Sequence, residues 1–470
     1  MIDINKNIKA VKSGIWYTLS NFMVKGIIFI TTPIFTRILT KREFGIYNNY
    51  ASWLAIITII VTLNLESTLI SAKFDFKKQF DKYILSILSL SALSTIIWCV
   101  VINVFYVQFT KLFGLERKYM NIMLVYLFFL PAVNIFQARE QYNFRYKKTV
   151  VISMLLSIST TILSIVLVIT MENKVYGRIL GSVIPTVIIG LIIYLFFIKR
   201  EKINIHYWKY ALPICIPYIP HLLSMTLLNS TDRVMIDKIC GSEATAIYSL
   251  AYLCGSIVTL FLTSLNSAYA PWLGEKLEDS DYKSITQFSK MYVVCFFVLG
   301  IGIMLISPEI LYVLGGSQYM DAKYVLAPVS MGCVCQFLYT LYVNIEQFKK
   351  KTFGMAIASM IAAVVNMGLN YWLIPQYGYL AAAYTTLVGY IILLFIHMFL
   401  VWKMGMGQIY NNKFNLLIVA IGVFSTVLIT LLYKFPVLRY MSILLYSIFL
   451  LTILVYNRGL ILKFIRERKN

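Results

Sequence analysis

The chain has 470 residues, of which 60% are hydrophobic and only 13% are charged. Soluble globular domains carry about 25% charged residues, and so apolar a surface needs lipid as its solvent. The composition therefore excludes an ordinary soluble protein. The 42 Lys and Arg residues exceed the 20 Asp and Glu residues and give a formal charge of +22. In a membrane protein such an excess is typical of loops that fix orientation, so we expect no nucleic-acid partner.

A membrane-spanning helix needs about 20 mainly apolar residues, and about fourteen segments meet this requirement. The predicted spans are residues 13–36, 44–66, 83–108, 119–139, 149–171, 176–198, 209–238, 244–268, 288–307, 324–346, 354–374, 378–402, 414–433 and 439–457. The seventh contains Pro213, Pro217 and Pro220, so we expect it to be kinked or broken. The predicted fold class is all-α, a polytopic membrane protein with short loops.

The distribution of basic residues predicts the orientation of the chain. If the N-terminus lies inside, the inner segments hold 28 Lys and Arg residues and the outer loops hold 13. Cytoplasmic loops collect Lys and Arg, so this bias favours N- and C-termini that are both cytoplasmic. It also supports an even number of spans.

Short matches recur about 200 residues apart. Glu140-Gln141-Tyr142 returns as Glu346-Gln347-Phe348, and Tyr176-Gly177 returns as Tyr377-Gly378. The matches fall at the same places in the two halves, which indicates an internal repeat, although apolar sequences also produce such pairs by chance. We predict one lobe at 1–200, a second at 201–403, and two appended helices with a basic tail at 404–470. Because each copy has six helices, both insert the same way, as parallel pseudo-symmetric lobes around a central cavity.

The first span carries a polar face. Thr18, Asn21, Lys25, Thr32 and Thr36 are spaced so that they share one side of a helix. An ammonium at the middle of a span costs about 2.5–3.5 kcal/mol unless it meets water or a partner. Lys25 could instead extend to a lipid headgroup, but it lies about 13 residues into the segment. We therefore predict that Lys25 and Asn21 line a cavity.

Two further spans show related polar stripes. The second contains Glu66 at its end. The eighth carries Tyr248, Tyr252, Ser256, Thr259, Thr263 and Asn266 at helical spacing. A Ser/Thr stripe also serves helix packing, and for the eighth span packing and a cavity remain equal alternatives.

The end of the seventh span concentrates charge at Asp232, Arg233, Asp237 and Lys238. This cluster is either solvated surface or a set of ion pairs or a gate. Arg233 can bind two phosphate oxygens at once, which a lysine cannot. Arg37, at the end of the first span, is a further candidate for the cavity, with a headgroup contact as the alternative.

The sequence shows no enzyme constellation. It lacks a nucleophile elbow, a phosphate-binding loop and a Cys-x-x-Cys motif, and the three histidines are scattered. We expect no cofactor and no metal site. Without an ATP site, transport has to be downhill or coupled to an ion gradient. Glu66, Asp232 and Asp237 are the acidic candidates to carry a coupling proton or sodium ion, with Lys238 beside them.

Several stretches resemble a known family, the O-antigen and capsular polysaccharide flippases. These belong to the multidrug/oligosaccharidyl-lipid/polysaccharide exporter superfamily. The stretches are Lys25–Arg37, Phe44–Tyr47, Asp232–Met235, Ala246–Tyr252, Asn366–Pro375 and Tyr377–Ala383. The resemblance covers most of residues 13–400.

The resemblance implies a transporter of the bacterial inner membrane that flips a polyprenyl-diphosphate-linked oligosaccharide from the cytoplasmic to the periplasmic leaflet. It implies alternating access, in which two lobes rock about a cationic cavity that holds sugar and diphosphate. Lipid II flippases of the superfamily carry several cavity arginines, whereas this sequence has Lys25. Membrane lipid, and polymerase or chain-length proteins, are the further partners it implies.

Three other functions remain to be compared. A multidrug or cation exporter, or a lipid II-type flippase, would share this fold, and the exporter predicts acids at the cavity centre. A polysaccharide polymerase or ligase would need a large outer loop, which the sequence lacks. We therefore expect a transporter and not an enzyme.

Overall fold

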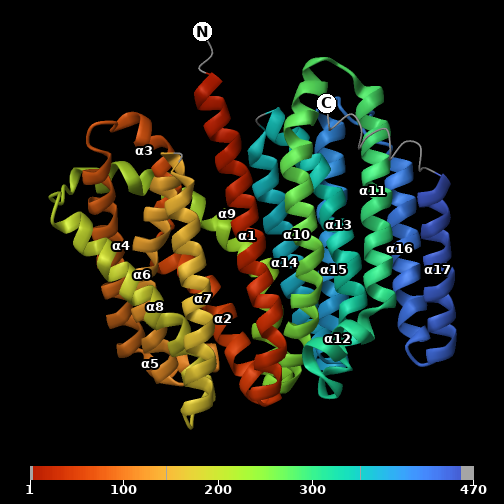
Figure 1. Ribbon diagram of the computed structural model, residues 1–470, viewed down its shortest axis with the longest axis horizontal. Coiled ribbons are helices and arrows are strands. Elements are labelled where there is room, and N and C mark those ends of the chain that lie inside the picture. The colour runs from red at the N-terminus through yellow and green to blue at the C-terminus, as the bar shows by residue number, and fades with distance from the viewer. Residues whose placement is uncertain (1–3, 144, 350, 457–470) are drawn as a thin grey trace. The chain divides into compact units, whose positions relative to one another are not determined.

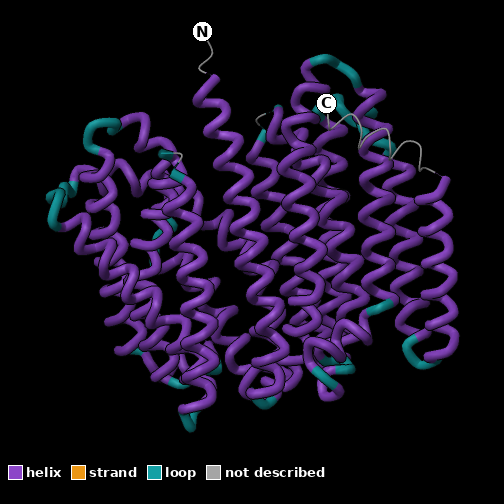
Figure 2. The backbone as a smooth tube through the Cα atoms, viewed as in Figure 1, coloured by secondary structure: helices purple, strands orange, loops and turns teal. Residues whose placement is uncertain are grey.

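The computed structural model describes residues 4–143, 145–349 and 351–456, and among these residues every regular element is a helix (Figure 1, Figure 2). Long apolar helices run along the whole described chain, which is the arrangement that lipid imposes, since every backbone group has to be satisfied within its own segment. The predicted all-α polytopic fold is therefore confirmed. The basic tail predicted after residue 456 lies outside the described residues.

Two compact units divide the chain. The first unit comprises Met1–Leu253, Leu314–Gly316 and Thr352–Gly389, and the second comprises Cys254–Val313, Ser317–Lys351 and Tyr390–Asn470. Neither unit coincides with a lobe of the predicted division at 200 and 403, which stays a prediction. Each unit is described here by itself.

Most helices of the chain's first half begin and end close to the predicted spans. They are α1 (Ile4–Ile38), α2 (Lys41–Val61), α4 (Phe80–Val104), α6 (Arg117–Tyr142), α7 (Tyr146–Thr170), α8 (Lys174–Ile198) and α9 (His206–Cys240). Polar caps set some of these starts. Thr40 and Glu43 form a reciprocal capping box at α2, and the Asn173 side chain accepts from a backbone amide at the start of α8.

The later long helices are equally close to prediction. They are α10 (Ser242–Glu278), α11 (Tyr282–Leu305), α13 (Ala322–Phe348), α14 (Thr352–Tyr377), α15 (Tyr379–Lys403), α16 (Asn412–Leu432) and α17 (Pro436–Tyr456). Within the second unit α13 packs against α11 and α16. By length and hydropathy, twelve described helices qualify as membrane spans, or thirteen with α9 counted as one bent span. The apolar stretch Pro436–Thr452 is shorter, so the count of fourteen stays a prediction.

The proline-rich seventh span is bent, as predicted. The parts His206–Pro220 and Leu222–Cys240 meet at 41°. Proline removes a backbone donor and its ring collides with the preceding turn, so three prolines within eight residues account for the bend.

Four short helices differ from the sequence-based prediction. The second span ends at Val61 and not at residue 66, because Leu63 and Asn64 adopt left-handed backbone angles with φ of 56° and 46°. The chain continues through η1 (Leu65–Thr68) and α3 (Leu69–Asp75). Two further short helices, α5 (Tyr106–Phe113) and α12 (Ser307–Gly315), follow long spans. Segments this short carry no span-length hydropathy signal.

A buried cluster of large side chains holds the first half together. Tyr83 of α4, Ala132 of α6 and Phe197 of α8 are almost fully buried and belong to one core with the start of α9. By contrast, α7 is mostly exposed along its apolar length, with Leu155 and Ile162 more than half accessible. In a membrane protein an exposed apolar face is the face that lipid covers.

Candidate functional site

A fully buried carboxylate, Asp232 of α9, forms the centre of a polar cluster in the first unit. Its side chain is 1% exposed. The Tyr248 hydroxyl donates to Oδ2 at 2.6 Å and the Thr386 hydroxyl donates to the same oxygen at 2.5 Å. The Asn370 amide donates to Oδ1 at 2.6 Å. A buried carboxylate needs such donors, and here they come from α10, α15 and α14.

A second layer of polar groups orients Asn370. The Thr385 hydroxyl donates to Asn370 Oδ1, and the Asn370 amide lies 3.2 Å from Asn366 Oδ1. All three side chains are almost completely buried. The Asn366 amide nitrogen has no hydrogen-bond partner among the described residues. Unpaired buried donors are uncommon, so this amide marks a place where a water molecule or a ligand oxygen would fit.

Arg233 follows directly after the buried carboxylate. Its guanidinium lies over the Tyr252 ring at 4.5 Å, and its buried Nε has no hydrogen-bond acceptor among the described residues. Tyr252 stacks on Tyr248 at 6.1 Å and its hydroxyl donates to Asn229 Oδ1 at 3.2 Å. The structure thus brings together four residues predicted for the site: Asp232, Arg233, Tyr248 and Tyr252. A stacked guanidinium with an unused donor is suited to bind an anion.

Asp237 forms a separate junction one and a half turns further along α9. Its Oδ1 accepts from Ser242 at 2.8 Å and its Oδ2 accepts from Asn49 of α2 at 2.8 Å. A Cβ atom at Gly45 would lie 1.7 Å from the Ser242 carbonyl oxygen, so only glycine permits this approach of α2. Asp237 therefore joins helices, while the neighbouring Lys238 is exposed.

The predicted residues of α1 lie apart from these contacts. Asn21 and Lys25 are exposed on the same side of the helix, one turn from each other. The Lys25 ammonium makes no hydrogen bond or ion pair with any side chain that the structure describes. Arg37 is also exposed, and its guanidinium donates to the Pro33 carbonyl at 3.0 Å. Their part in a cavity stays a prediction.

Glu66 lies in η1 and not in the second span where it was predicted. The left-handed turn at Leu63 and Asn64 ends the helix before it. Burial raises the pKa of Glu66, and a hydrogen bond with the Asn134 side chain opposes that effect. The structure does not bring Glu66 into contact with Asp232 or Asp237.

The lower part of the α10 stripe belongs to the second unit. Thr259 donates to the Ser256 carbonyl of its own helix at 2.7 Å. Asn266 pairs with Asn344 of α13, whose amide donates to Asn266 Oδ1 at 2.7 Å. These contacts fit the helix-packing alternative, because small hydroxyls and amides join neighbouring membrane helices in this way.

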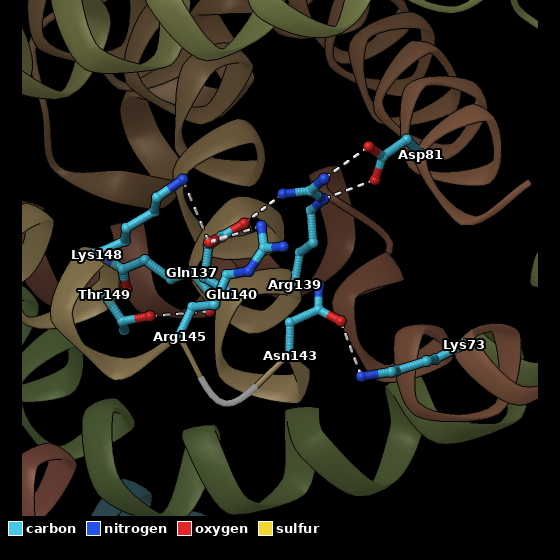
Figure 3. A network of polar contacts seen from close by, with 9 residues as sticks. All are labelled: Lys73, Asp81, Gln137, Arg139, Glu140, Asn143, Arg145, Lys148 and Thr149. Carbon is cyan, nitrogen blue, oxygen red and sulfur yellow. Dashed lines mark hydrogen bonds and ion pairs between the residues drawn. The ribbon is translucent and has the colours of Figure 1, made fainter. Parts of the chain in front are cut away.

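A second polar network gathers where α6 and α7 meet (Figure 3). Glu140 is fully buried and forms an ion pair with Arg139, which also holds Asp81 through two hydrogen bonds of 2.6 and 2.7 Å. Arg145 and Lys148 approach the other Glu140 oxygen at 3.9 and 3.8 Å. The sequence analysis noted Glu140 only as part of the repeat and did not assign it chemistry.

Several contributors to the two networks were missed. Asn366, Asn370, Thr385, Thr386 and Asn49 hold the acids of α9, and none was predicted. A signal existed for one pair, since Asn366 and Asn370 lie one turn apart in an otherwise apolar span. For the others the sequence separation from Asp232 or Asp237 exceeds 130 residues, and only the folded chain brings them close.

A bundle of membrane-spanning helices with buried polar clusters, and no site for a covalent step, defines a transporter and not an enzyme. Comparison with known proteins gives the family. The model of the family described as "Polysaccharide biosynthesis protein" matches residues 10–277, and the model of MatE matches residues 217–372. The chain belongs to the polysaccharide biosynthesis protein family, within the multidrug/oligosaccharidyl-lipid/polysaccharide exporter superfamily of flippases.

One curated relative and several solved structures are similar over most of their length. An uncharacterized membrane protein of Methanocaldococcus jannaschii is 22% identical over 456 residues, which is 89% of each chain. The lipid II flippase MurJ in an inward closed conformation superimposes with a TM-score of 0.71 at 16% identity, over 95% of this chain and 100% of that one. An inward-facing multidrug resistance transporter of the MATE family gives 0.60 at 14% identity, over 82% and 98%. These similarities establish the shared fold.

Proposed function

We propose that this protein flips a polyprenyl-diphosphate-linked oligosaccharide from the cytoplasmic to the periplasmic leaflet of a bacterial inner membrane, with both termini in the cytoplasm. The observation that carries the proposal is the Arg233 guanidinium, which lies on Tyr252 and keeps an unused buried donor next to the Asp232 cluster. A diphosphate is the anion that such a donor suits. The match to a polysaccharide biosynthesis family over more than half the chain supports a saccharide as the cargo.

Binding would divide the substrate by chemistry. Arg233, together with Lys25 and Arg37, would neutralise the diphosphate, because guanidinium and ammonium groups bind phosphate oxygens strongly in a site of low dielectric constant. Asn21, Tyr252, Thr259 and Asn266 would offer hydrogen bonds and ring faces to sugar hydroxyls. The polyprenyl chain would stay in the bilayer, where its transfer costs nothing.

Asp232 would couple transport to a cation gradient, with Asp237, Lys238 and Glu66 as gating groups. The carboxylate accepts from Tyr248, Thr386 and Asn370, so it connects α9 to α10, α15 and α14. A proton that binds to Oδ2 would turn this acceptor into a donor, and the Tyr248 or Thr386 hydroxyl would have to rotate or leave. A sodium ion would compete for the same oxygens. Either event changes the contacts that join four helices, which is the kind of two-state element that alternating access needs.

Reconstitution tests the proposal directly. The full chain is placed in proteoliposomes with a fluorescent short-chain prenyl-diphosphate oligosaccharide, and flipping is followed by quenching from outside. Arg233→Gln removes a charge-assisted contact worth about 1.5–3 kcal/mol, so we expect flipping to slow about tenfold or more. Lys25→Ala should slow it several-fold, and Asp232→Asn should abolish its dependence on an imposed pH or sodium gradient.

Arg42→Gln is the matched control, since Arg42 is an exposed arginine of α2 outside the cluster. It should change the rate by less than twofold. Full flipping rates in both the Arg233→Gln and Lys25→Ala variants would contradict the proposal, provided that all variants elute as folded protein in gel filtration.

A multidrug or cation exporter is the second candidate, favoured by the match to the MatE model at residues 217–372 and by the buried acid at position 232. The same liposomes distinguish the two functions. An exporter would move a cationic dye and ignore the prenyl-diphosphate substrate, and its activity would depend on Asp232 but not on Arg233.

A further inference from the structure

A groove in the first unit combines a cationic end with an apolar wall. It has a volume of about 430 Å³ and lies between the end of α6, the start of α7 and the last turns of α8. Arg139, Arg145, Lys148 and Arg200 form its charged end. Its apolar wall consists of Phe136, Ile152, Leu155, Ile189, Ile192, Ile193 and Phe196. None of these residues belongs to the Asp232 cluster.

The charges of this groove are not balanced within the network. Four cations line it, and the carboxylates that pair with them are Glu140 and Asp81. Arg139 already satisfies both carboxylates through direct hydrogen bonds. Two positive charges therefore remain over, and the groove should attract an anion.

Two of the cations keep donors for a ligand. Arg145 and Lys148 are 58% and 61% exposed, and they lie 3.9 and 3.8 Å from Glu140 Oε2. These separations exceed a hydrogen bond, so Oε2 has no hydrogen-bond partner among the described residues. Figure 3 shows both side chains reaching toward Glu140 from the start of α7. An anionic oxygen placed between them would accept hydrogen bonds that the protein itself does not use.

The apolar wall determines the class of ligand. Arg145 and Leu155 are ten residues apart, which corresponds to about 15 Å along the helix. Leu155 and Ile192 are more than half exposed in the groove's wall, on helices that face lipid. A free phosphate would use only the charged end, whereas a lipid with an anionic headgroup would use both.

We propose that this groove binds an anionic phospholipid of the surrounding bilayer, with its phosphate between Arg145 and Lys148 and one acyl chain along Ile152, Leu155 and Ile192. All four cations lie in segments that the charge bias assigns to the cytoplasmic side, so the lipid comes from the inner leaflet. The bound lipid occupies the outer side of α7 and α8 and is separate from the transported substrate. The proposal does not depend on the identity of the cargo.

Native mass spectrometry of the purified full chain in detergent tests the site, with dioleoyl phosphatidylglycerol and dioleoyl phosphatidylcholine as probes. We expect phosphatidylglycerol to bind at least about tenfold more tightly. Each basic residue at a membrane surface contributes roughly a factor of five, so Arg145→Gln/Lys148→Gln should weaken phosphatidylglycerol binding about thirtyfold and leave phosphatidylcholine unchanged. Lys147→Gln is the matched control, because Lys147 is exposed on the same turn but does not line the groove. It should change affinity less than twofold.

A second pair of variants tests the apolar wall. Ile192→Trp fills the groove and should weaken phosphatidylglycerol binding about fivefold or more, whereas Leu191→Trp, one residue away and also exposed outside the groove, should not. Sodium pyrophosphate at 1 mM should not displace the lipid. The proposal is overturned if the two lipids bind equally, if the double variant behaves as Lys147→Gln does, or if pyrophosphate alone occupies the site as tightly as the lipid.

Discussion

Two glutamates at corresponding places of the internal repeat, Glu140 in the first unit and Glu346 in the second, share a backbone and differ in their partners. Each lies two residues before the end of its helix, α6 and α13, and is fully buried. In each case the amide five residues later donates to the glutamate carbonyl at 2.9 Å. In each case Oε2 has no hydrogen bond among the described residues.

The counter-charges differ. Glu140 pairs with Arg139, and Arg145 and Lys148 lie nearby. Glu346 pairs with the imidazole of His397 on α15, whose Nδ1 lies 2.6 Å from Oε1 and whose ring stacks on Tyr339. An arginine keeps its charge, whereas a glutamate and a histidine can share one proton as a neutral pair.

The comparison separates what a repeat conserves from what it leaves open. The helix end and its carbonyl geometry recur, while the partner of the carboxylate comes from different elements. We infer that Glu140 has to remain ionised, because a permanent charge faces it, and that Glu346 can be neutral. The two positions should therefore respond differently to the loss of their partners.

The largest expected effect is the loss of Arg139. Arg139→Gln leaves Glu140 buried without its direct partner and also releases Asp81, and breaking a buried pair costs about 3–5 kcal/mol. We expect the free energy of unfolding in detergent, measured by denaturant titration, to fall by about 3 kcal/mol. The double variant Arg139→Gln/Glu140→Gln should recover at least half of this loss. If it is no more stable than the single variant, the buried charge of Glu140 is not the cause.

The corresponding change in the second unit should cost less. His397→Leu removes the partner of Glu346, but this carboxyl can take up a proton instead of remaining a buried charge. We expect a loss of about 1–2 kcal/mol, mainly from the missing hydrogen bond. His397→Leu/Glu346→Leu should restore most of it, because replacement of a buried pair by apolar side chains is often neutral. A loss as large as that of Arg139→Gln would show that the two pairs carry charge alike.

Much of this fold could be predicted from the sequence, because the bilayer requires long apolar helices and hydropathy detects them. The spans, the bend at Pro213, Pro217 and Pro220, and the recurrence of Glu140 at Glu346 were all accessible in this way. The short helices after Val61 and Val104 were not, because left-handed turns and amphipathic segments of eight residues or fewer leave no span-length signal.

The site was predictable only in part for a different reason. Asp232 and Tyr248 lie 16 residues apart and face each other across one helix connection, so their pairing was within reach of sequence reasoning. Asn370 and Thr386 reach Asp232 only through the packing of α14 and α15, and His397 reaches Glu346 in the same manner. Chemistry that depends on contacts between distant helices has no local pattern.

The smallest effects should come from Arg145 and Lys148, and they sharpen the comparison most. Both are more than half exposed and lie beyond hydrogen-bond distance of Glu140. Exposed ion pairs of this kind contribute roughly 0–1 kcal/mol, so Arg145→Gln and Lys148→Gln should each change the free energy of unfolding by less than about 0.5 kcal/mol, as Lys147→Gln should. If they do, Arg139 alone neutralises Glu140, just as His397 alone pairs with Glu346, and the two outer cations are available to a lipid phosphate. If either variant loses as much stability as Arg139→Gln, Glu140 depends on three cations together, and the proposed lipid site loses the donors on which it rests.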